Sequence, residues 1–459
     1  MPDLGMVTTT IRRGRGNLPQ MPLVNMFSEK AVTEPRQFSL QSFPGLTATG
    51  VTLGVGPIKA LLLKDGVAGG LMVGVSAGAL YIDAVDIGVV TGSGPASIAG
   101  NEIGTIATSG AAAVFWDTAV FSTIVFPDGA NVRKVFEQGG RFLFLRDETQ
   151  RFYWTEPLAL MLGTGGAVVI NGVDYASAES EPDKLVDALP MEDALVIGGT
   201  ATIEFWSKTG DVDLPYVPST GRVFQKGVKA TGCMVTFDNS FAWVSPQNIV
   251  YRAGNVPERV SDAGIEEIIA ASSGCRVDAY FFEGHEFLKI SLDDETIEYD
   301  AQTGQWNERK TGITNFRGGA VAGGLFGSLT SGALYELSGY LDIDGYHERS
   351  FCAGFPLNGG AVVVDNVTLR TNPGQTEYLT GDYTNPVVEM FQSYDGGMTF
   401  ENGMPENLGE QGHYRREVEW RALGFADAPG FFGKFRVTDP VPFRVSGASF
   451  NERGGGRSR

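Results

Sequence analysis

Apolar residues along this chain occur in short runs, and glycine or small polar residues interrupt them every few positions. Runs such as 71–75 and 287–290 are rich in β-branched and aromatic side chains, which is typical of strands joined by tight turns. Helical spacing occurs at 265–271, where Ser261 or Asp262 can cap the first turn. The pattern therefore predicts an all-β protein.

A repeat lies within this pattern. Each copy is an apolar strand, a tight polar turn and a second strand that carries an aromatic residue. The string Gly-Ala-Leu-Tyr occurs at 78–81 and 332–335, and Thr-Ile-Glu occurs at 202–204 and 296–298. Seven aromatic residues mark the copies: Tyr81, Phe115, Tyr153, Phe205, Tyr251, Tyr299 and Tyr335.

The spacing of these aromatic residues predicts a β-propeller. The intervals are 34, 38, 52, 46, 48 and 36 residues, and their mean of roughly 42 fits four-stranded blades. A lone hairpin cannot bury both faces, whereas blades packed around an axis can. We expect seven blades over residues 47–340, with six as the alternative because two intervals are short. Residues 51–53 should pair with the last repeat and close the circle.

The chain changes character after residue 340. Longer alternating runs follow, at 361–364, 367–370, 387–391, 415–420 and 434–437. They predict an antiparallel β-sandwich over residues 341–450. Residues 451–459 have no apolar side chain, so we expect a flexible tail there. Residues 1–46 are expected to form an N-terminal arm, without a core of its own, and a strand that leads into the propeller.

Composition and charge exclude several classes of protein. The 459 residues are 42% hydrophobic and include 29 Phe, so the chain can build large cores and is not disordered. The formal net charge of −19 argues against tight nucleic-acid binding. Three distant cysteines, at 233, 275 and 352, predict folding in a reducing compartment. We expect no signal peptide and no membrane span.

Few residues carry candidate chemistry. The histidines at 285, 347 and 413 share no ligand spacing, and His285 is interpreted as a histidine at a blade edge. Asp342 and Asp344 match only half of a calcium loop, so a solvated linker is the favoured interpretation. The chain has no nucleophile elbow and no phosphate loop. We therefore expect no metal, no cofactor and no enzymatic activity.

The most specific short motif is an Asp box at 393–400. Its pattern residues are Ser393, Asp395, Gly397, Thr399 and Phe400. The motif resembles the turns of sialidase-type propellers, where the Asp caps a hairpin turn through backbone N–H groups, so we expect a structural role. A propeller-type glycosidase or depolymerase stays open as an alternative and predicts a cluster of Arg or carboxylate groups at the propeller mouth. A generic propeller binding scaffold is the other alternative.

An ordered series of strings resembles the tail hub (nozzle) proteins of short-tailed bacteriophages, the podoviruses, which are also called packaged-DNA stabilisation proteins. The series begins with Met-Pro-Leu-Val-Asn-Met at 21–26 and ends with Lys-Thr-Gly at 310–312. Between them lie 42–46, 202–205 with Ser207 and Gly210, 223–227, 241–245, 265–269, 285–286, 299–300 and Trp306. The order makes the resemblance specific. It covers about residues 20–345 and is weaker beyond.

The resemblance implies a structural virion protein. It implies a homo-hexameric ring in the short tail, below the portal-adaptor ring and beside the tail needle and the tailspike or fibre. It also implies assembly in the host cytoplasm, retention of packaged DNA and a conduit for its ejection. An acidic lumen would let DNA slide through without tight binding. The family role carries no catalytic residues.

Three arginines lie close together near the N-terminus, at Arg12, Arg13 and Arg15. A basic segment with no core of its own cannot offset the entropy of ordering by itself. We therefore expect this segment to become ordered only at an interface, with the three arginines as candidate docking residues.

Overall fold

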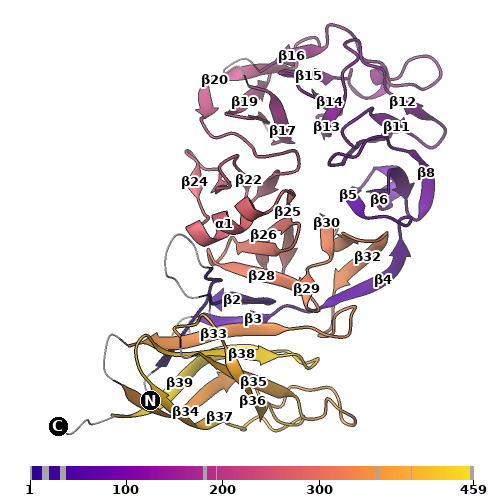
Figure 1. Cartoon of the computed structure of the whole chain (residues 1–459). Coiled ribbons are helices and arrows are strands. Elements are labelled where there is room, and N and C mark those ends of the chain that lie inside the picture. The colour runs from indigo at the N-terminus through magenta and orange to yellow at the C-terminus, as the bar shows by residue number, and fades with distance from the viewer. Residues whose placement is uncertain are drawn as a thin grey trace.

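The computed structural model describes residues 3–12, 20–30, 38–178, 183–192, 194–357, 361–393 and 395–454. Two β domains make up this part of the chain, and Figure 1 shows the propeller above the sandwich. Seven sheets surround one axis. The predicted seven-bladed propeller is confirmed, and the six-bladed alternative is wrong.

The first three blades have four antiparallel strands each. Blade 1 consists of β5 (Ile58–Leu62), β6 (Val73–Ser76), β7 (Ala79–Ile82) and β8 (Val85–Val89). Blade 2 consists of β9 (Ser97–Gly100), β10 (Thr105–Thr108), β11 (Val114–Trp116) and β12 (Phe121–Thr123). Blade 3 consists of β13 (Val132–Gln138), β14 (Arg141–Arg146), β15 (Arg151–Trp154) and β16 (Tyr175–Ser177).

The other four blades follow in chain order. Blade 4 consists of β17 (Leu185–Pro190), β18 (Ala194–Gly199), β19 (Ile203–Lys208) and β20 (Tyr216–Phe224). Blade 5 consists of β21 (Met234–Phe237), β22 (Ser240–Val244), β23 (Val250–Arg252) and β24 (Glu258–Arg259). Blade 6 consists of β25 (Cys275–Phe282), β26 (His285–Leu292), β27 (Thr296–Asp300), β28 (Trp306–Thr311) and β29 (Thr314–Asn315). Blade 7 consists of β30 (Gly318–Ala322), β31 (Leu325–Ser328), β32 (Ala333–Leu337) and β4 (Leu46–Thr52).

The seven marker aromatic residues occupy equivalent places. Each lies on the third strand of its blade: β7, β11, β15, β19, β23, β27 and β32. The first strands of successive blades pack against one another around the centre, where Figure 1 labels β5, β13, β17, β25 and β30. The repeat read from the sequence is therefore the blade itself.

A strand from the N-terminal part of the chain closes the circle, as predicted. Strand β4 pairs antiparallel with β32, with Thr52 opposite Ala333. Leu53 follows, and its backbone N–H donates to the carbonyl of Gly332 at 2.7 Å. The Leu53 side chain is fully buried between blades 7 and 1. This pairing removes two sheet edges that an open propeller would expose.

The second domain is a β-sandwich of ten strands. They are β1 (Asp3–Met6), β2 (Met26–Lys30), β3 (Phe38–Ser42), β33 (Arg349–Pro356), β34 (Val362–Thr371), β35 (Val387–Ser393), β36 (Glu401–Asn407), β37 (Val418–Ala426), β38 (Gly430–Val437) and β39 (Arg444–Gly454). One sheet has the order β2-β3-β39-β34-β37, and the other has the order β33-β38-β35-β36. Strand β1 joins them.

The expectation of an N-terminal arm without a core is wrong for the described residues. In β1, Leu4 pairs with Ala448 of β39, while Met6 pairs with Ala353 of β33. The Leu4 side chain is fully buried in the core of the sandwich. The N-terminal segment therefore completes a domain in which its direct neighbours, β33 and β39, lie more than 340 residues away in the chain.

The expected C-terminal tail is also shorter than predicted. Strand β39 continues to Gly454, which lies opposite Val362 of β34. Backbone hydrogen bonds to β34 order residues 451–454, and these bonds need no apolar side chain. Residues 455–459 lie outside the described part of the chain.

Helix is rare, as the pattern predicted. The helix α1 (Ala263–Ala271) lies between blades 5 and 6, and the Asp262 carboxylate caps it by accepting from the Ile265 N–H at 2.9 Å. Two short 3₁₀ turns are η1 (Ala68–Gly70) and η2 (Leu158–Met161). None of the helices in the described residues has the length and apolarity that crossing a bilayer requires.

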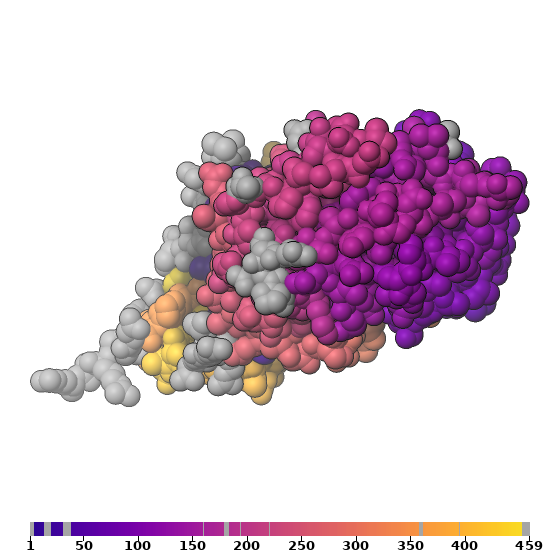
Figure 2. Space-filling view, turned by 90° about the horizontal axis from the view of Figure 1, so that it is seen from above, coloured from indigo at the N-terminus to yellow at the C-terminus, as the bar shows by residue number. Residues whose placement is uncertain are grey.

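Figure 2 shows the surface from the propeller end, where the indigo-to-magenta blades form a continuous body.

Candidate assembly site at the domain junction

Residues 20–25 run between blade 6 and the sandwich and bond to both. Asn25 is fully buried. Its side-chain amide donates to the carbonyls of Lys310 at 3.1 Å and Glu348 at 2.8 Å, and its side-chain oxygen accepts from the Lys310 N–H at 3.0 Å. One asparagine therefore ties β28 of the propeller to the segment that leads into β33 of the sandwich.

His285 forms a second connection between the domains. It begins β26 of blade 6, and its Nδ1 lies 2.8 Å from Asp300 of β27. Its Nε2 lies 2.9 Å from the carboxylate of Glu29 on β2 of the sandwich. The ring is buried against Phe27 and Phe287. The interpretation as a simple histidine at a blade edge missed this role.

The hydrogen bond to Asp300, with a further contribution from Glu29, raises the pKa of His285. The stabilisation by His285 should therefore be complete below the ordinary histidine pKa of about 6.5 and disappear as the pH rises through the higher folded-state pKa. At low pH, His285→Gln should reduce the free energy of unfolding by about 1.5–3 kcal/mol, as expected for charged hydrogen bonds. Denaturant unfolding across this pH range measures the difference.

The matched control for this prediction is His413→Gln, because His413 is exposed. That variant should follow the wild type at every pH. A constant difference between wild type and His285→Gln at low and high pH would contradict the assignment of the bridge to protonated His285.

A third connection involves Asp342, which the sequence suggested as part of a solvated linker. The structure corrects this interpretation. Asp342 is buried, and its carboxylate accepts from the Leu46 N–H at 2.9 Å and lies 3.2 Å from Nδ1 of His347. Nε2 of His347 lies 3.0 Å from the carbonyl of Phe43. The aspartate therefore holds the start of β4 against the segment that leaves the propeller, while Asp344 pairs with Arg317 on the surface.

Arg309 adds an aromatic contact to the junction. Its guanidinium lies 3.8 Å from the ring centre of Phe43 and 4.7 Å from that of Phe316. Arg309 belongs to β28, and Phe43 lies between β3 and β4. This contact joins β28 to the segment that leads into β4, the strand that closes the propeller.

Arg12 is the one described member of the three candidate docking arginines. Its guanidinium donates to Glu308 Oε1 at 2.8 Å and to Glu308 Oε2 at 2.5 Å, and it lies 3.5 Å from Glu295. Glu308 is almost completely buried. Arg12 thus docks on blade 6 of its own chain, while Arg13 and Arg15 lie outside the described residues.

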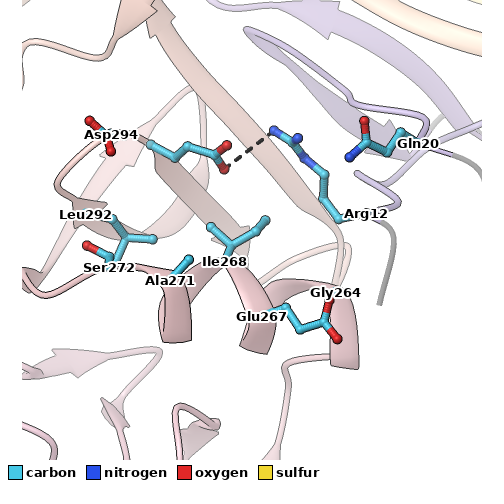
Figure 3. Close-up of a pocket in the computed structure, with 10 residues that line it drawn as sticks. Arg12, Gln20, Gly264, Glu267, Ile268, Ala271, Ser272, Leu292 and Asp294 are labelled. Atoms are coloured by element: carbon cyan, nitrogen blue, oxygen red, sulfur yellow. Dashed lines mark hydrogen bonds and ion pairs between the residues drawn. The ribbon is translucent and has the colours of Figure 1, made fainter. Parts of the chain in front are cut away.

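A cavity of about 350 Å³ lies beside Arg12. Figure 3 shows Arg12 facing the side of α1 that carries Ile268 and Ala271, with its ion pair to Glu295 as a dashed line. Gln20 lines the cavity on the same side as Arg12, opposite Ser272 and Leu292. The cavity therefore marks the place where the N-terminal segment, α1 and blade 6 meet.

The arrangement is a mechanical connection between the two domains. Buried hydrogen bonds, ion pairs and ring contacts fix the two domains to each other, so a force on one is transmitted to the other. Within the described ranges, no group of three His, Cys, Asp or Glu side chains is placed to hold a metal ion. The junction has the character expected of a rigid assembly module.

The Asp box forms the turn between β35 and β36. Asp395 Oδ1 accepts from the N–H groups of Met398 and Thr399 at 2.9 Å, and its Oδ2 accepts from the Thr399 hydroxyl at 2.7 Å. The Ser393 hydroxyl donates to Asp395 at 2.8 Å and accepts from the Gly397 N–H at 2.7 Å. Phe400 ends the turn before β36. The partners of the Asp395 carboxylate in these hydrogen bonds all lie within the turn itself.

Asp395→Ala should lower the stability of the sandwich by about 1 kcal/mol, because the turn loses its side-chain-to-backbone hydrogen bonds. The Thr399 N–H bond is the main reason that the pKa of Asp395 falls to about 2. Denaturant unfolding measures the loss, and Asp382→Ala, at an exposed loop position of the same domain, is the control. An equal loss in both variants would contradict the turn-capping role.

Sequence reasoning did not find the junction residues. Asn25, His285, Asp342 and Arg309 are isolated polar residues in unrelated segments, and their partners lie more than 250 positions away or on neighbouring strands. The sequence did carry a signal for a different site: in β25, the first strand of blade 6, Arg276 and Asp278 alternate with apolar residues. Charges at period two within a buried strand indicate a polar inner face.

The fold and the junction define a class of protein: a seven-bladed propeller closed by an N-terminal strand and joined rigidly to a sandwich that the same N-terminal segment completes. The chain belongs to the bacteriophage P22 Gp10 family. The family's beta-propeller model matches residues 13–322 and its beta-sandwich model matches residues 348–452. The second match extends the family assignment beyond residue 345, where the sequence resemblance was weaker.

The chain is similar to the tail hub protein gp10 of Salmonella phage P22, with 27% identity over 306 residues. The match covers 60% of this chain and 62% of that protein, so the chain spans less than two thirds of its relative. Among solved structures, it is similar to the propeller domain of Cps50 (Swd1) from Myceliophteria thermophila, with 9% identity, a TM-score of 0.42 and coverage of 64% and 100%. It is also similar to the extracellular domain of BT4673 from B. thetaiotaomicron, with 10% identity, a TM-score of 0.43 and coverage of 84% and 56%.

Proposed function

We propose that this chain is a structural tail hub of a short-tailed bacteriophage and has no enzymatic activity. The observation that carries the proposal is the match of both Gp10 family domains, in order, to the two domains of this chain. The name of the P22 relative, a tail hub protein, supports the same role. The buried junction supports it physically, because a tail component must transmit load between its neighbours without hinging.

In this proposal the hub forms a homo-hexameric ring in the virion tail after assembly in the host cytoplasm. One side of the ring binds the portal-adaptor ring, and the tail needle and tailspike or fibre bind near the other. Arg13 and Arg15 contact a neighbouring subunit or the adaptor. Arg12 instead positions the segment by its ion pair with Glu308.

The charge of the chain supports a conduit for DNA. A net charge of −19 per copy gives a ring that repels the phosphate backbone. Double-stranded DNA would therefore slide through the lumen without sticking, and the closed ring would retain it until ejection. Purified subunits should bind duplex DNA weakly, and added salt should abolish the binding.

The test is a nonsense mutation in the phage that encodes this chain. Particles without the chain should package DNA and then lose it, as measured by nuclease-resistant genome content, and the wild-type chain supplied from a plasmid should restore retention. Electron microscopy of complete particles should place a six-fold ring of the chain in the tail. Full DNA retention without the chain, or its absence from the tail, would overturn the proposal.

A further inference from the structure

A cavity of about 640 Å³ lies at the centre of the propeller. Residues of the first strands β5, β9, β13, β21 and β25 line it. These strands belong to five different blades; β5, β13 and β25 are labelled near the centre of the propeller in Figure 1. Nothing in the junction or in the tail hub role uses this cavity.

Three cations from three blades line the cavity: Lys59 on β5, Lys134 on β13 and Arg276 on β25. The Lys59 ammonium is half-buried, and its hydrogen-bond partners are the carbonyl of Gly94 at 3.5 Å and the hydroxyl of Ser109 at 3.4 Å. Both partners are neutral. Within the described part of the chain, the positive charge of Lys59 has no ion-pair partner.

Buried carboxylates hold the other two cations in place. Lys134 pairs with Asp187, whose carboxylate is fully buried and also accepts from the Gly232 N–H at 2.8 Å. Arg276 binds Asp278 through two hydrogen bonds of 2.8 Å. The cations are therefore fixed at the wall of the cavity before any ligand arrives, which lowers the entropy cost of binding.

Lys59 is the cation of this cavity that remains free for an anion. The charged residues that line the cavity are Lys59, Lys134, Arg276 and the carboxylate Asp293. Asp187 and Asp278, which do not line the cavity themselves, compensate Lys134 and Arg276. The lining therefore presents three cations and one carboxylate to an incoming anion, in a chain with a net charge of −19.

We propose that this axial cavity binds an acidic peptide segment of a partner protein, whose carboxylates contact Lys59, Lys134 and Arg276. The volume exceeds what a single small oxyanion would fill, because a water-sized group occupies only about 30 Å³. A DNA occupant is disfavoured, because the chain as a whole has a net charge of −19 and repels a phosphate backbone. A peptide strand with several carboxylates fits both the volume and the spread of the cations over three blades.

Cys275 provides a reporter inside the same cavity. It lines the wall beside Arg276, and the Cys233 thiol donates to its carbonyl at 3.2 Å. Cys275 is partly exposed, whereas Cys233 and Cys352 are buried with raised pKa values. Sequence reasoning did not identify Cys233 as the neighbour of Cys275, because the two cysteines are 42 positions apart. Cys275 should therefore react fastest with iodoacetamide.

The experiment uses the purified full-length chain and a fluorescein-labelled hexaglutamate peptide. Fluorescence anisotropy should show saturable binding, and the bound peptide should slow alkylation of Cys275 as read by mass spectrometry. Lys59→Glu should weaken binding at least tenfold, which corresponds to about 1.4 kcal/mol, and Lys59→Gln should weaken it less. Lys64→Glu is the matched control, because the Lys64 side chain is 47% exposed, pairs with Glu137 and lies outside the cavity. The Lys64→Glu variant should bind the peptide like wild type.

Three outcomes would overturn the proposal: no saturable binding, equal losses in Lys59→Glu and Lys64→Glu, or unchanged alkylation of Cys275. Displacement by equimolar inorganic phosphate would point to a free oxyanion instead, and displacement by equimolar duplex DNA to a nucleic acid; either result overturns it as well. Thermal unfolding of each variant identifies any loss of fold, and Lys59→Gln keeps the test valid if Lys59→Glu does not fold. The result is independent of the tail hub proposal, because it needs neither a ring nor a phage particle.

Discussion

Asp278→Asn is expected to lower the free energy of unfolding by about 3–5 kcal/mol, because it removes the counter-charge of the completely buried Lys289 and of the partly exposed Arg276. Asp278 binds Arg276 at 2.8 Å and Lys289 at 3.2 Å. The Lys289 side chain is completely buried, so water cannot replace the lost partner. Denaturant unfolding followed by tryptophan fluorescence measures the loss.

The pH dependence provides an independent check. Burial alone would raise the pKa of Asp278, but the charges of Arg276 and Lys289 outweigh it and lower the pKa to about 2. The stabilisation is therefore complete above the unfolded-state pKa of about 3.9 and disappears as the pH falls towards 2. The wild type and Asp278→Asn should converge in stability over that range.

The matched control is Asp293→Asn at the exposed rim of the same cavity. Asp293 accepts hydrogen bonds from Ser273 and from the Gly274 N–H, and it pairs with no buried cation. Its loss should cost about 1 kcal/mol. Equal losses in the two variants would show that the buried charges on blade 6 do not depend on Asp278.

Deletion of residues 2–12 is expected to have the second large effect and to destabilise the free subunit before any assembly step. The deletion removes β1, which pairs with both sheets of the sandwich, and it removes the Arg12 partner of the buried Glu308. Leu4→Ala alone should cost about 2–5 kcal/mol, because the side chain is fully buried. Calorimetry of the purified subunit should show a lower sandwich transition.

The control for Leu4→Ala is Leu379→Ala, the same truncation at a side chain that is 78% exposed in the same domain. That variant should stay within about 0.5 kcal/mol of wild type. A deletion variant with wild-type stability would contradict the structural role of β1. Because the deletion destabilises the subunit itself, docking is tested more cleanly by Arg13→Ala and Arg15→Ala, which leave β1 in place.

The sequence by itself determined the local elements and their repetition. Period-two patterns, turn residues and the recurring aromatic residues depend only on neighbouring positions. They predicted seven blades, the closing strand around Thr52 and a short helix capped by Ser261 or Asp262, of which the structure has Asp262. The change of pattern after residue 340 predicted the sandwich for the same reason. The ordered strings also placed the chain in its family.

Only the tertiary structure decided which distant segments meet. Strand β1 has no pattern that identifies β39 and β33 as its neighbours, and residues 451–454 lack the apolar side chains that mark a strand. The junction and the axial cavity arise in the same way, since Leu46 meets Asp342 and Lys59 shares a wall with Arg276. A polar side chain in a sequence shows its charge but not its partner, and closing the propeller is what brings those partners within hydrogen-bond distance.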